Sequence, residues 1–263
     1  RSVSRGLGDV YKRQKLTYAG NKSFISSILK SKRVRFIKSD INDTKKYTNF
    51  LNNCDLAINI AAESHVDNSF ISPLNFTKTN SLGAHAFFLE CIKKKVKKIL
   101  HVSSDEVYGE KVTGTCFENQ LVNPTNPYSA SKAAAEILIN SYKYTYKKEI
   151  IIVRANNIYG IRQYPEKLIS TSIVNLIHNK PIPIHGNGKN IRYYLSAEDF
   201  ANALILLVKK RDKGTFNVGS NFFEQNINIA KHICKIFKKN PKKFIKFTTV
   251  SYTHLRAHET RFY

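Results

Sequence analysis

The sequence has 263 residues, enough for one large α/β domain or for a domain with a small second lobe. Hydrophobic residues make up 42% of the chain, but no run of them approaches the roughly 20 apolar residues that cross a bilayer, so we expect no membrane contact. The net charge of +24 would suit a nucleic-acid-binding protein, yet the lysines are scattered and clustered arginines are missing, which favours a solvated basic surface without a specific nucleic acid.

The two ends of the chain differ in character from the rest. Residues 1–14 (RSVSRGLGDVYKRQ) show neither a strand pattern nor a helix period, and residues 251–263 (SYTHLRAHETRFY) break from the preceding composition. We expect both to be non-native segments outside the fold. Gly6 and Gly8 do not form a dinucleotide-binding fingerprint, because no strand precedes them and no third glycine follows.

Between these ends, short apolar strands alternate with helical patterns. We expect strands at residues 34–37, 56–60, 99–102 and 150–153, and helices at residues 43–52, 73–94 and 128–146. In the second helix, the pattern places Phe76, Leu82, Phe87, Phe88 and Cys91 inward. The alternation predicts an α/β fold with a doubly wound parallel sheet, Rossmann-like with its first βα unit missing, over residues 15–163.

The pattern changes after residue 163. We expect helices at residues 166–178, 198–209 and 227–237, a turn region at 181–190 that contains proline and glycine, and a strand at 214–218. This order predicts a smaller α/β lobe over residues 164–250, interleaved with the first domain, that binds the substrate. The four cysteines (Cys54, Cys91, Cys116 and Cys234) form no CxxC pair and no zinc spacing, so we expect no metal and free thiols in the cytoplasm.

Polar clusters follow three of the expected strands, at residues 61–67, 103–106 and 156–159. Parallel sheets bind ligands beyond the carboxyl ends of their strands. Tyr128 and Lys132 lie four residues apart and so share a face of the next helix. A lysine ammonium beside a phenol favours the phenolate, which is a base, although such a pair also arises by chance in a lysine-rich helix.

The second cluster contains two adjacent acids, Asp105 and Glu106, after Ser104. Two carboxyl groups at the end of a strand can serve as general acid and general base. A solvated acidic turn is the alternative interpretation of these residues in isolation. Their position one strand before the Tyr128–Lys132 pair favours a catalytic interpretation.

Five stretches in this order resemble the extended short-chain dehydrogenase/reductase family, and within it the dTDP-glucose (nucleotide-sugar) 4,6-dehydratases. The stretches are KLTYAGN from Lys15, AAESHVD from Ala61, SDEVYG from Ser104, PYSASK from Pro127 and PEKLI from Pro165. The resemblance covers about residues 15–237. It implies NAD as the cofactor and a nucleotide-diphospho-hexose, dTDP-glucose or UDP-glucose, as the substrate.

The resemblance also implies a role for each catalytic residue. Tyr128 would remove the proton of the sugar 4-hydroxyl, with Lys132 tuning Tyr128 and holding the nicotinamide ribose. Glu106 would then take the C5 proton while Asp105 protonates the departing 6-hydroxyl, and Ser104 would hydrogen-bond the 4-oxygen. The product would be a 4-keto-6-deoxy sugar, formed after hydride returns to C6.

Further residues are assigned to binding by the resemblance alone. Besides Tyr128 and Lys132, the cofactor would meet Asp40, Ile41, Ala61, Ala62, Glu63, Ser64, Thr79 and Ile158. Besides Ser104, the substrate would meet His65, Asn157, Lys167, Leu168, Pro183, Ile184, His185, Arg192 and Asn226. The family also implies a homodimer formed through the long helices.

Some positions depart from the family pattern. Ile158 replaces a common Asn, and Tyr193 and Tyr194 replace an Asp-Trp pair after Arg192. Gln14 stands where an acid should bind the adenosine ribose, and the glycine-rich first turn is absent. A 4-epimerase or decarboxylase of the same family is the alternative, but these enzymes need the Tyr–Lys pair without an acid pair that eliminates water.

We expect these 263 residues by themselves to be nearly inactive, because no glycine-rich turn is present to hold the pyrophosphate of NAD⁺. Equilibrium dialysis should therefore detect no tight binding of NAD⁺. Stoichiometric binding at low micromolar concentration would contradict this expectation.

Overall fold

The computed structural model of the chain describes residues 9–109, 115–146, 148–210 and 212–249. Residues 1–8 and 251–263, two parts of the expected non-native segments, lie outside the described residues. No helix within the described ranges is long and apolar enough to span a bilayer.

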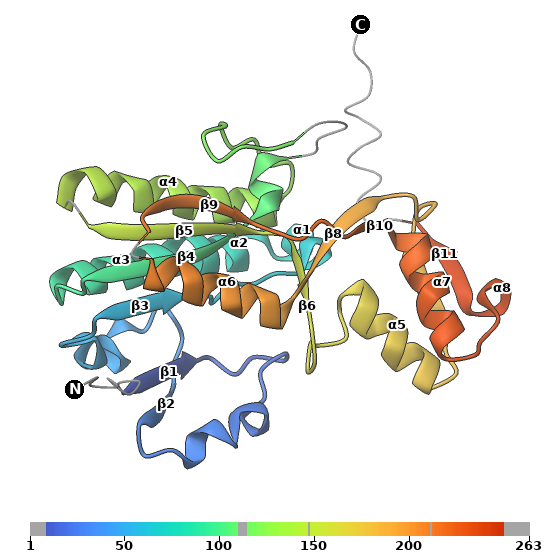
Figure 1. Ribbon diagram of the computed structural model, residues 1–263, viewed down its shortest axis with the longest axis horizontal. Helices are drawn as coiled ribbons and strands as arrows, with labels where there is room; N and C mark the ends of the chain where they lie inside the picture. Colours follow the sequence, from blue (N-terminus) through green and yellow to red (C-terminus); the bar gives the residue numbers. More distant parts are fainter. Residues whose placement is uncertain (1–8, 110–114, 147, 211, 250–263) are drawn as a thin grey trace, which may run out of the picture.

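A four-stranded parallel sheet forms the centre of the molecule, in the order β3-β4-β5-β9 (Figure 1). Its strands are β3 (Leu56–Asn59), β4 (Lys98–Ser104), β5 (Glu149–Ala155) and β9 (Gly214–Val218). All four were expected from the sequence. The runs of apolar and β-branched residues in β4 and β5 suit central strands that are covered on both faces.

Side chains from β4 and β5 pack alternately against the two faces of this sheet. Ile99, Ile150 and Ile152 join a core with Phe88 of α3 (Ala84–Lys93) and Ile139 of α4 (Pro127–Tyr146). The intervening residues, among them Leu100 and Ile151, join a second core with α6 (Ala197–Lys209). Helices therefore cover both faces, as a doubly wound sheet requires.

The expected helix at 73–94 is continuous but irregular. It comprises α2 (Pro73–Phe76), a π-helical segment (η5, Thr77–Gly83) and α3, and it follows α1 (Val66–Ile71). Leu82, which was expected to point inward, is 57% exposed. The π-turn explains this error, because its i→i+5 bonding shifts the phase of the following residues from a 3.6-residue period.

Two segments differ in type from the expectation. Residues 43–52 form two short 3₁₀-helices, η3 (Thr44–Lys46) and η4 (Thr48–Leu51), rather than one α-helix. Tyr47 separates them at φ −129°, and its buried hydroxyl donates to the carbonyl of Ile41 at 2.7 Å. The expected turn region at 181–190 contains β7 (Ile182–His185), whose Ile182 and Ile184 are buried in the core of the lobe.

Most of the elements after β5 build the lobe toward the right of Figure 1. β6 (Asn157–Tyr159), β8 (Ile191–Ser196) and β10 (Phe223–Gln225) form a sheet in the order β10-β8-β6. β7 pairs with β11 (Ile245–Thr248) beside α5 (Leu168–Ile177), α7 (Asn226–Ile236) and α8 (Pro241–Phe244). Between these elements the chain returns to the central sheet through α6 and β9.

Residues 10–14, expected to lie outside the fold, form strand β1 (Val10–Gln14) instead. This strand pairs in parallel with β2 (Val34–Lys38), and the 3₁₀-helices η1 (Lys22–Ile25) and η2 (Ile28–Lys30) lie between the two in the chain. The ring of Tyr11 contacts that of Phe50 at a centroid distance of 5.2 Å, and the Arg13 guanidinium lies 5.3 Å from the centre of the Tyr47 ring. These contacts with η4 and its neighbour explain why a segment without a clear pattern becomes a strand.

Candidate active site

A cavity of about 360 Å³ lies beyond the carboxyl ends of β4 and β5, beside the lobe. It brings together all five residues expected to be catalytic: Ser104, Asp105, Glu106, Tyr128 and Lys132. It is also lined by many of the residues expected to bind cofactor or substrate, namely Ala62, Ser64, Asn157, Ile158, Lys167, Leu168, Arg192 and Asn226. The polar clusters that follow three expected strands therefore contribute to one cavity.

The acid turn starts at the last residue of β4 and continues into the short 3₁₀-helix η6 (Asp105–Tyr108). Ser104 Oγ accepts from the backbone N–H of Glu106 at 3.2 Å and donates to Asp105 Oδ1 at 3.3 Å. Asn156, which directly follows β5, donates from Nδ2 to Asp105 Oδ2 at 2.8 Å. Both oxygens of Asp105 are thus held from the ends of two adjacent strands.

Burial raises the pKa of Asp105 to about 6, and the charge of Glu106 adds to this rise. The hydrogen bonds from Asn156 and Ser104 and the charge of Arg192 act in the opposite direction. A carboxyl group with a pKa of about 6 holds a proton in part of the population near neutral pH. Asp105 therefore suits the role of proton donor.

Glu106 is held by the residue that begins α4. Asn126 Nδ2 donates to Glu106 Oε2 at 3.3 Å, while Asn126 Oδ1 accepts from the backbone N–H of Ser129 at 2.8 Å. The Asn126 N–H in turn donates to Ser129 Oγ at 3.3 Å, so the two residues cap the helix reciprocally. Asn126 therefore connects the acid turn to the helix that carries Tyr128 and Lys132.

The ammonium of Lys132 is buried and donates to the carbonyl of Val102 at 2.6 Å. Burial lowers the pKa of Lys132 to about 8, although the charge of Glu136 raises it. The ring of Tyr128 contacts Phe76 edge to face at a centroid distance of 6.3 Å. Lys132 is thus positioned by the backbone of β4 one turn along α4 from Tyr128.

The expected tuning of Tyr128 by Lys132 stays a prediction, and other groups set the pKa of Tyr128 in this structure. Burial raises the pKa of Tyr128, and the charges of Glu106 and Asp105 raise it further, while a hydrogen bond with Ser104 lowers it. The charges of Glu106 and Asp105 oppose the phenolate, and the ammonium of Lys132 donates to the carbonyl of Val102. The protein alone therefore keeps Tyr128 protonated at neutral pH.

The residues expected on the cofactor side lie partly outside the cavity. Asp40 forms an ion pair with Lys15 at 2.8 Å; burial would raise its pKa, but hydrogen bonds from Asn42 and Lys15 lower it to about 2. The side chain of Ile41 packs in the core at 2% exposure. Thr79 is half-buried in the π-turn.

The loop after β3 is held by two buried amides. Asn59 Oδ1 accepts from the backbone N–H of Ala61 at 3.2 Å. Asn80 Oδ1 accepts from the N–H of Glu63 at 2.8 Å, and Asn80 Nδ2 donates to the carbonyl of Glu63 at 2.9 Å. These bonds fix the backbone over residues 61–63, where contact with a nucleotide is expected.

The same loop is tied to the lobe on its substrate side. Lys167 Nζ donates to the carbonyl of Ser64 at 2.6 Å, and the His65 ring lies 3.2 Å from the carbonyl of Glu166 through Nε2. Burial lowers the pKa of Lys167, opposed by the nearby carboxylates of Glu106, Glu166 and Asp67. Lys167 therefore brings a partly desolvated amine to the cavity.

At the far wall, Tyr194 donates from its hydroxyl to Asn226 Oδ1 at 3.1 Å, and Asn157 Nδ2 donates to the carbonyl of Tyr193 at 3.4 Å. Arg192 is exposed at this wall, where its planar guanidinium can hold an anion. Three other expected residues, Pro183, Ile184 and His185, lie on β7 outside the cavity lining of the described residues. Among them, His185 reaches Asp67 at 3.8 Å, on α1.

Sequence reasoning missed several lining or supporting residues. Asn126 was missed, and Asn156 was expected in the polar cluster at 156–159 but without a role of its own, although each adjoins an expected functional residue. Ser103 and Tyr194 also line the cavity. Among the residues that the structure describes, no group of three or more His, Cys, Asp or Glu side chains could hold a metal ion.

Comparison with known proteins places these features in a family. A family model described as GDP-mannose 4,6 dehydratase matches residues 6–263. The dTDP-D-glucose 4,6-dehydratase of Dictyostelium discoideum is 41% identical over 236 residues, which cover 84% of this chain and 54% of that protein. A trifunctional enzyme of Arabidopsis thaliana that includes UDP-glucose 4,6-dehydratase is 39% identical over 241 residues, 89% of this chain and 36% of that protein. The chain thus spans about half or less of these relatives.

A solved structure has the same fold. DesIV, a dTDP-glucose 4,6-dehydratase from Streptomyces venezuelae with NAD and TYD bound, superposes with a TM-score of 0.89 at 30% identity. The match covers 92% of this chain and 75% of that one. It confirms the expected Rossmann-like fold class.

Replacing Asp105 should stabilise the protein at alkaline pH. Because the folded-state pKa of Asp105 lies above the ordinary value of 3.8, its favourable contribution to the free energy of unfolding is present below that value and is lost as the pH rises through about 6. We expect Asp105→Asn to raise the melting temperature by roughly 2–6 °C at pH 8 and to have little effect at pH 4.

Circular dichroism melts at both pH values measure this difference. Asp55→Asn is the matched control, because the hydrogen bond from Lys97 lowers the pKa of that exposed carboxyl group, so neutralising it should bring no gain at pH 8. A lower melting temperature for Asp105→Asn at pH 8 would show that the ionised Asp105 carboxylate does not destabilise the folded protein.

Proposed function

Because the chain belongs to the GDP-mannose 4,6-dehydratase family, we propose that it carries the catalytic residues of an NAD-dependent lyase that dehydrates a nucleotide-diphospho-hexose to its 4-keto-6-deoxy derivative. The single observation that carries this proposal is the presence of Asp105 and Glu106 in one cavity with Tyr128 and Lys132. A tyrosine and a lysine suffice for oxidation at C4. Elimination of water needs an acid and a base in addition.

The residues at the site fit a dinucleotide cofactor. Ser103 Oγ lines the cavity near Lys132, and Ser39 Oγ and Asn42 Oδ1 flank Asp40; all three atoms are buried and without a hydrogen-bond partner among the described residues. These polar atoms can serve the nicotinamide and adenosine ends. When bound, NAD⁺ supplies the acceptor and later the donor of hydride.

The side chains then divide the proton transfers among them. Tyr128 takes the proton of the 4-hydroxyl, and Ser104, which hydrogen-bonds Tyr128, holds the same oxygen. The 4-keto group acidifies the C5 proton, which Glu106 removes. Asp105 donates its proton to the 6-hydroxyl, which leaves as water. Lys167, Arg192 and Asn226 bind the diphosphate and the sugar from the lobe.

The nucleotide is thymidine or uridine diphosphate in this proposal. The names of the two curated relatives include dTDP-glucose and UDP-glucose as substrates, and we take dTDP-glucose as the first to test. The alternative reaction, 4-epimerisation, needs Tyr128 and Lys132 but gives Asp105 and Glu106 no catalytic role. The product therefore separates the two reactions.

Incubating the whole protein with NAD⁺ and dTDP-glucose or UDP-glucose should yield a product two hydrogens and one oxygen lighter than the substrate, with a 4-keto group. Mass spectrometry and alkaline absorbance measure it. Glu106→Gln should slow its formation by roughly 10²- to 10⁴-fold, because the C5 proton then lacks a base. A product of unchanged mass with inverted C4 would contradict the dehydration and favour the epimerase.

We also propose that the protein is a cytoplasmic homodimer. All four cysteines are free thiols, which supports a reducing compartment. Helices α1, α2 and α4 contact one another, and their apolar side chains Ile71, Leu74 and Ile137 are 77%, 80% and 62% exposed. Exposed apolar side chains of this size on packed helices suit an interface with a second copy.

Light scattering after gel filtration should therefore give twice the mass of one chain. Leu74→Glu combined with Ile137→Glu should reduce it to the mass of one chain, since two charges would be buried without partners. Ile236→Glu, on the similarly exposed face of α7 in the lobe, is the control and should leave the dimer intact. A monomer in the unmodified protein would refute the homodimer.

A further inference from the structure

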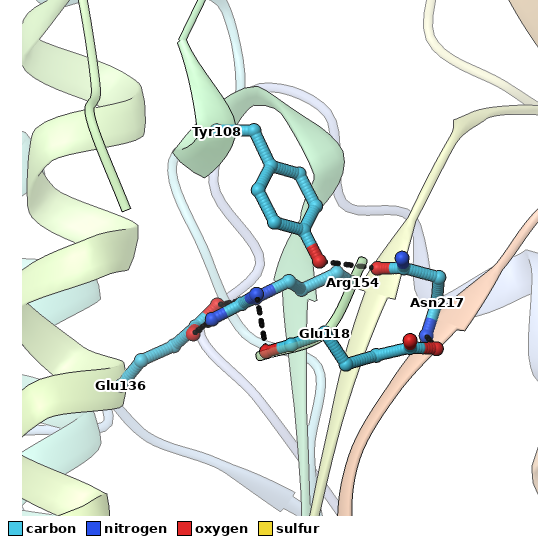
Figure 2. A network of polar contacts seen from close by, with 5 residues as sticks. All are labelled: Tyr108, Glu118, Glu136, Arg154 and Asn217. Carbon is cyan, nitrogen blue, oxygen red and sulfur yellow. Dashed lines mark hydrogen bonds and ion pairs between the residues drawn. The ribbon is translucent and has the colours of Figure 1, made fainter. Parts of the chain in front are cut away.

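Five polar and aromatic residues form a cluster next to the acid turn. Figure 2 shows them: Tyr108, Glu118, Glu136, Arg154 and Asn217, here called the anchor cluster. They come from η6, the loop after it, α4, β5 and β9. Within the part of the chain that the structure describes, none of the five lines the cavity. The reaction as proposed above gives them no role.

An ion pair lies at the centre of the anchor cluster. Arg154 donates from Nε to both carboxylate oxygens of Glu136, at 3.2 and 3.1 Å, and from Nη2 to Oε2 at 2.7 Å. The side chains are 6% and 2% exposed. Removing one partner of such a buried ion pair strongly destabilises the folded protein, because the other charge stays buried without a partner. The pair therefore holds α4 and β5 in one arrangement.

Tyr108 connects this pair to the acid turn. Its ring lies 4.6 Å from the Arg154 guanidinium, and its hydroxyl donates to Asn217 Oδ1 on β9 at 2.7 Å. Tyr108 is the last residue of η6, two positions after Glu106. The 3₁₀-helix that carries both acids is thus attached at its end to two strands of the central sheet.

The chain beyond Tyr108 is held equally closely. Gly109 has φ +79°, and a Cβ atom there would lie 2.0 Å from the carbonyl oxygen of Asn123, so no other residue fits this approach. The loop returns past Glu118, whose Oε1 accepts from the backbone N–H of Asn217 at 2.8 Å and whose carbonyl accepts from Arg154 Nη1 at 3.3 Å. The anchor cluster therefore holds the acid turn and the returning loop together.

The same cluster reaches the two elements that carry the acids and the Tyr128–Lys132 pair, η6 and α4. Glu136 lies one helical turn after Lys132 on α4, and Arg154 lies two residues before Asn156, which holds Asp105. We propose that Tyr108 and Arg154 are positioning residues that fix the acid turn against the Tyr128–Lys132 helix for the two proton transfers of the elimination. This inference rests on the proposed dehydration.

Elimination makes a stricter demand on this geometry than oxidation does. Oxidation at C4 needs only α4 and Ser104 to be in place. Elimination also needs Glu106 at C5 and Asp105 at the C6 oxygen of the same bound sugar. A displacement of about 1 Å can cost roughly 100-fold in rate. Loosening the anchor cluster should therefore affect elimination before oxidation.

Tyr108→Phe tests this, because it removes the hydroxyl, with its hydrogen bonds to Asn217 and Arg154, and keeps the ring over the Arg154 guanidinium. In the whole protein, we expect KM to stay within about twofold and kcat for the dehydrated product to fall roughly 10- to 100-fold. Oxidation at C4 should continue, so reduced nicotinamide should accumulate on the enzyme, visible by its absorbance during single turnover. Equal slowing of oxidation and elimination would overturn the positioning role.

Three further variants separate positioning from general damage. Asn217→Asp keeps the acceptor for the Tyr108 hydroxyl and should retain most of the activity that Asn217→Leu loses. Tyr142→Phe is the matched control, because it also removes a tyrosine hydroxyl that contacts another side chain, His85, but lies far along α4 from the acids. Its kcat should not change. If Asn217→Leu is as active as Asn217→Asp, the inference is wrong.

Hydrogen exchange tests the geometry without the reaction. The N–H of Gly109 bonds to the carbonyl of Glu106 at 3.1 Å, and the N–H of Asn123 to that of Val107 at 2.8 Å. In Tyr108→Phe, both amides should exchange roughly tenfold faster while those of β4 and β5 do not change. Unchanged exchange at Gly109 and Asn123 would refute the positioning role of the anchor cluster, whichever product the enzyme forms. An epimerised product refutes the proposed function separately.

Discussion

The parallel pairing of β4 with β5 is the constraint on which the candidate site depends. Its register places Ser104 opposite Ala155, so that Asp105 and Asn156 leave the sheet side by side and meet at 2.8 Å. A slip of one residue would turn every side chain of a strand to the other face. The two cores prevent this slip, because Ile151 and Ile152 pack on opposite faces. The apolar interior of the sheet thus determines which polar groups meet at its edge.

The position of α4 depends on contacts at two levels. Near the cavity, Asn126 caps the helix and also binds Glu106. Deeper in the fold, Glu136 on the same helix binds Arg154 of β5. Tyr128 and Lys132 lie between these two attachments, and Lys132 adds a third through the carbonyl of Val102. Because α4 is attached on either side of Tyr128 and Lys132, it has little freedom to tilt there. A site built from several elements requires such a rigid support.

Much of this arrangement could be predicted from local sequence, and the part that could not depends on distant partners. The apolar runs of β4 and β5 and the four-residue spacing of Tyr128 and Lys132 are local signals, and parallel topology brings their ends together. The hydrogen bond from Asn156 to Asp105 spans 51 positions and depends on strand register, so no local pattern indicates it. β1 was missed for the same reason, because its side chains pack on η4 and its neighbour rather than follow an alternation of their own. The π-turn near Leu82 arises within a helix whose sequence follows the ordinary period.

The charges in the cavity affect both the acid turn and the Tyr128–Lys132 pair. Burial and the nearby carboxylates keep a proton on Tyr128, whereas Asp105, with a pKa of about 6, holds one in part of the population near neutral pH. In the proposed reaction, Asp105 needs its proton for the leaving hydroxyl, whereas Tyr128 must give its proton up to act as a base. The ammonium of Lys132 donates to the carbonyl of Val102, which leaves its positive charge in place one helical turn from Tyr128. In the proposed reaction, a bound NAD⁺ would add its own positive charge to that of Lys132, and both charges would favour loss of the Tyr128 proton.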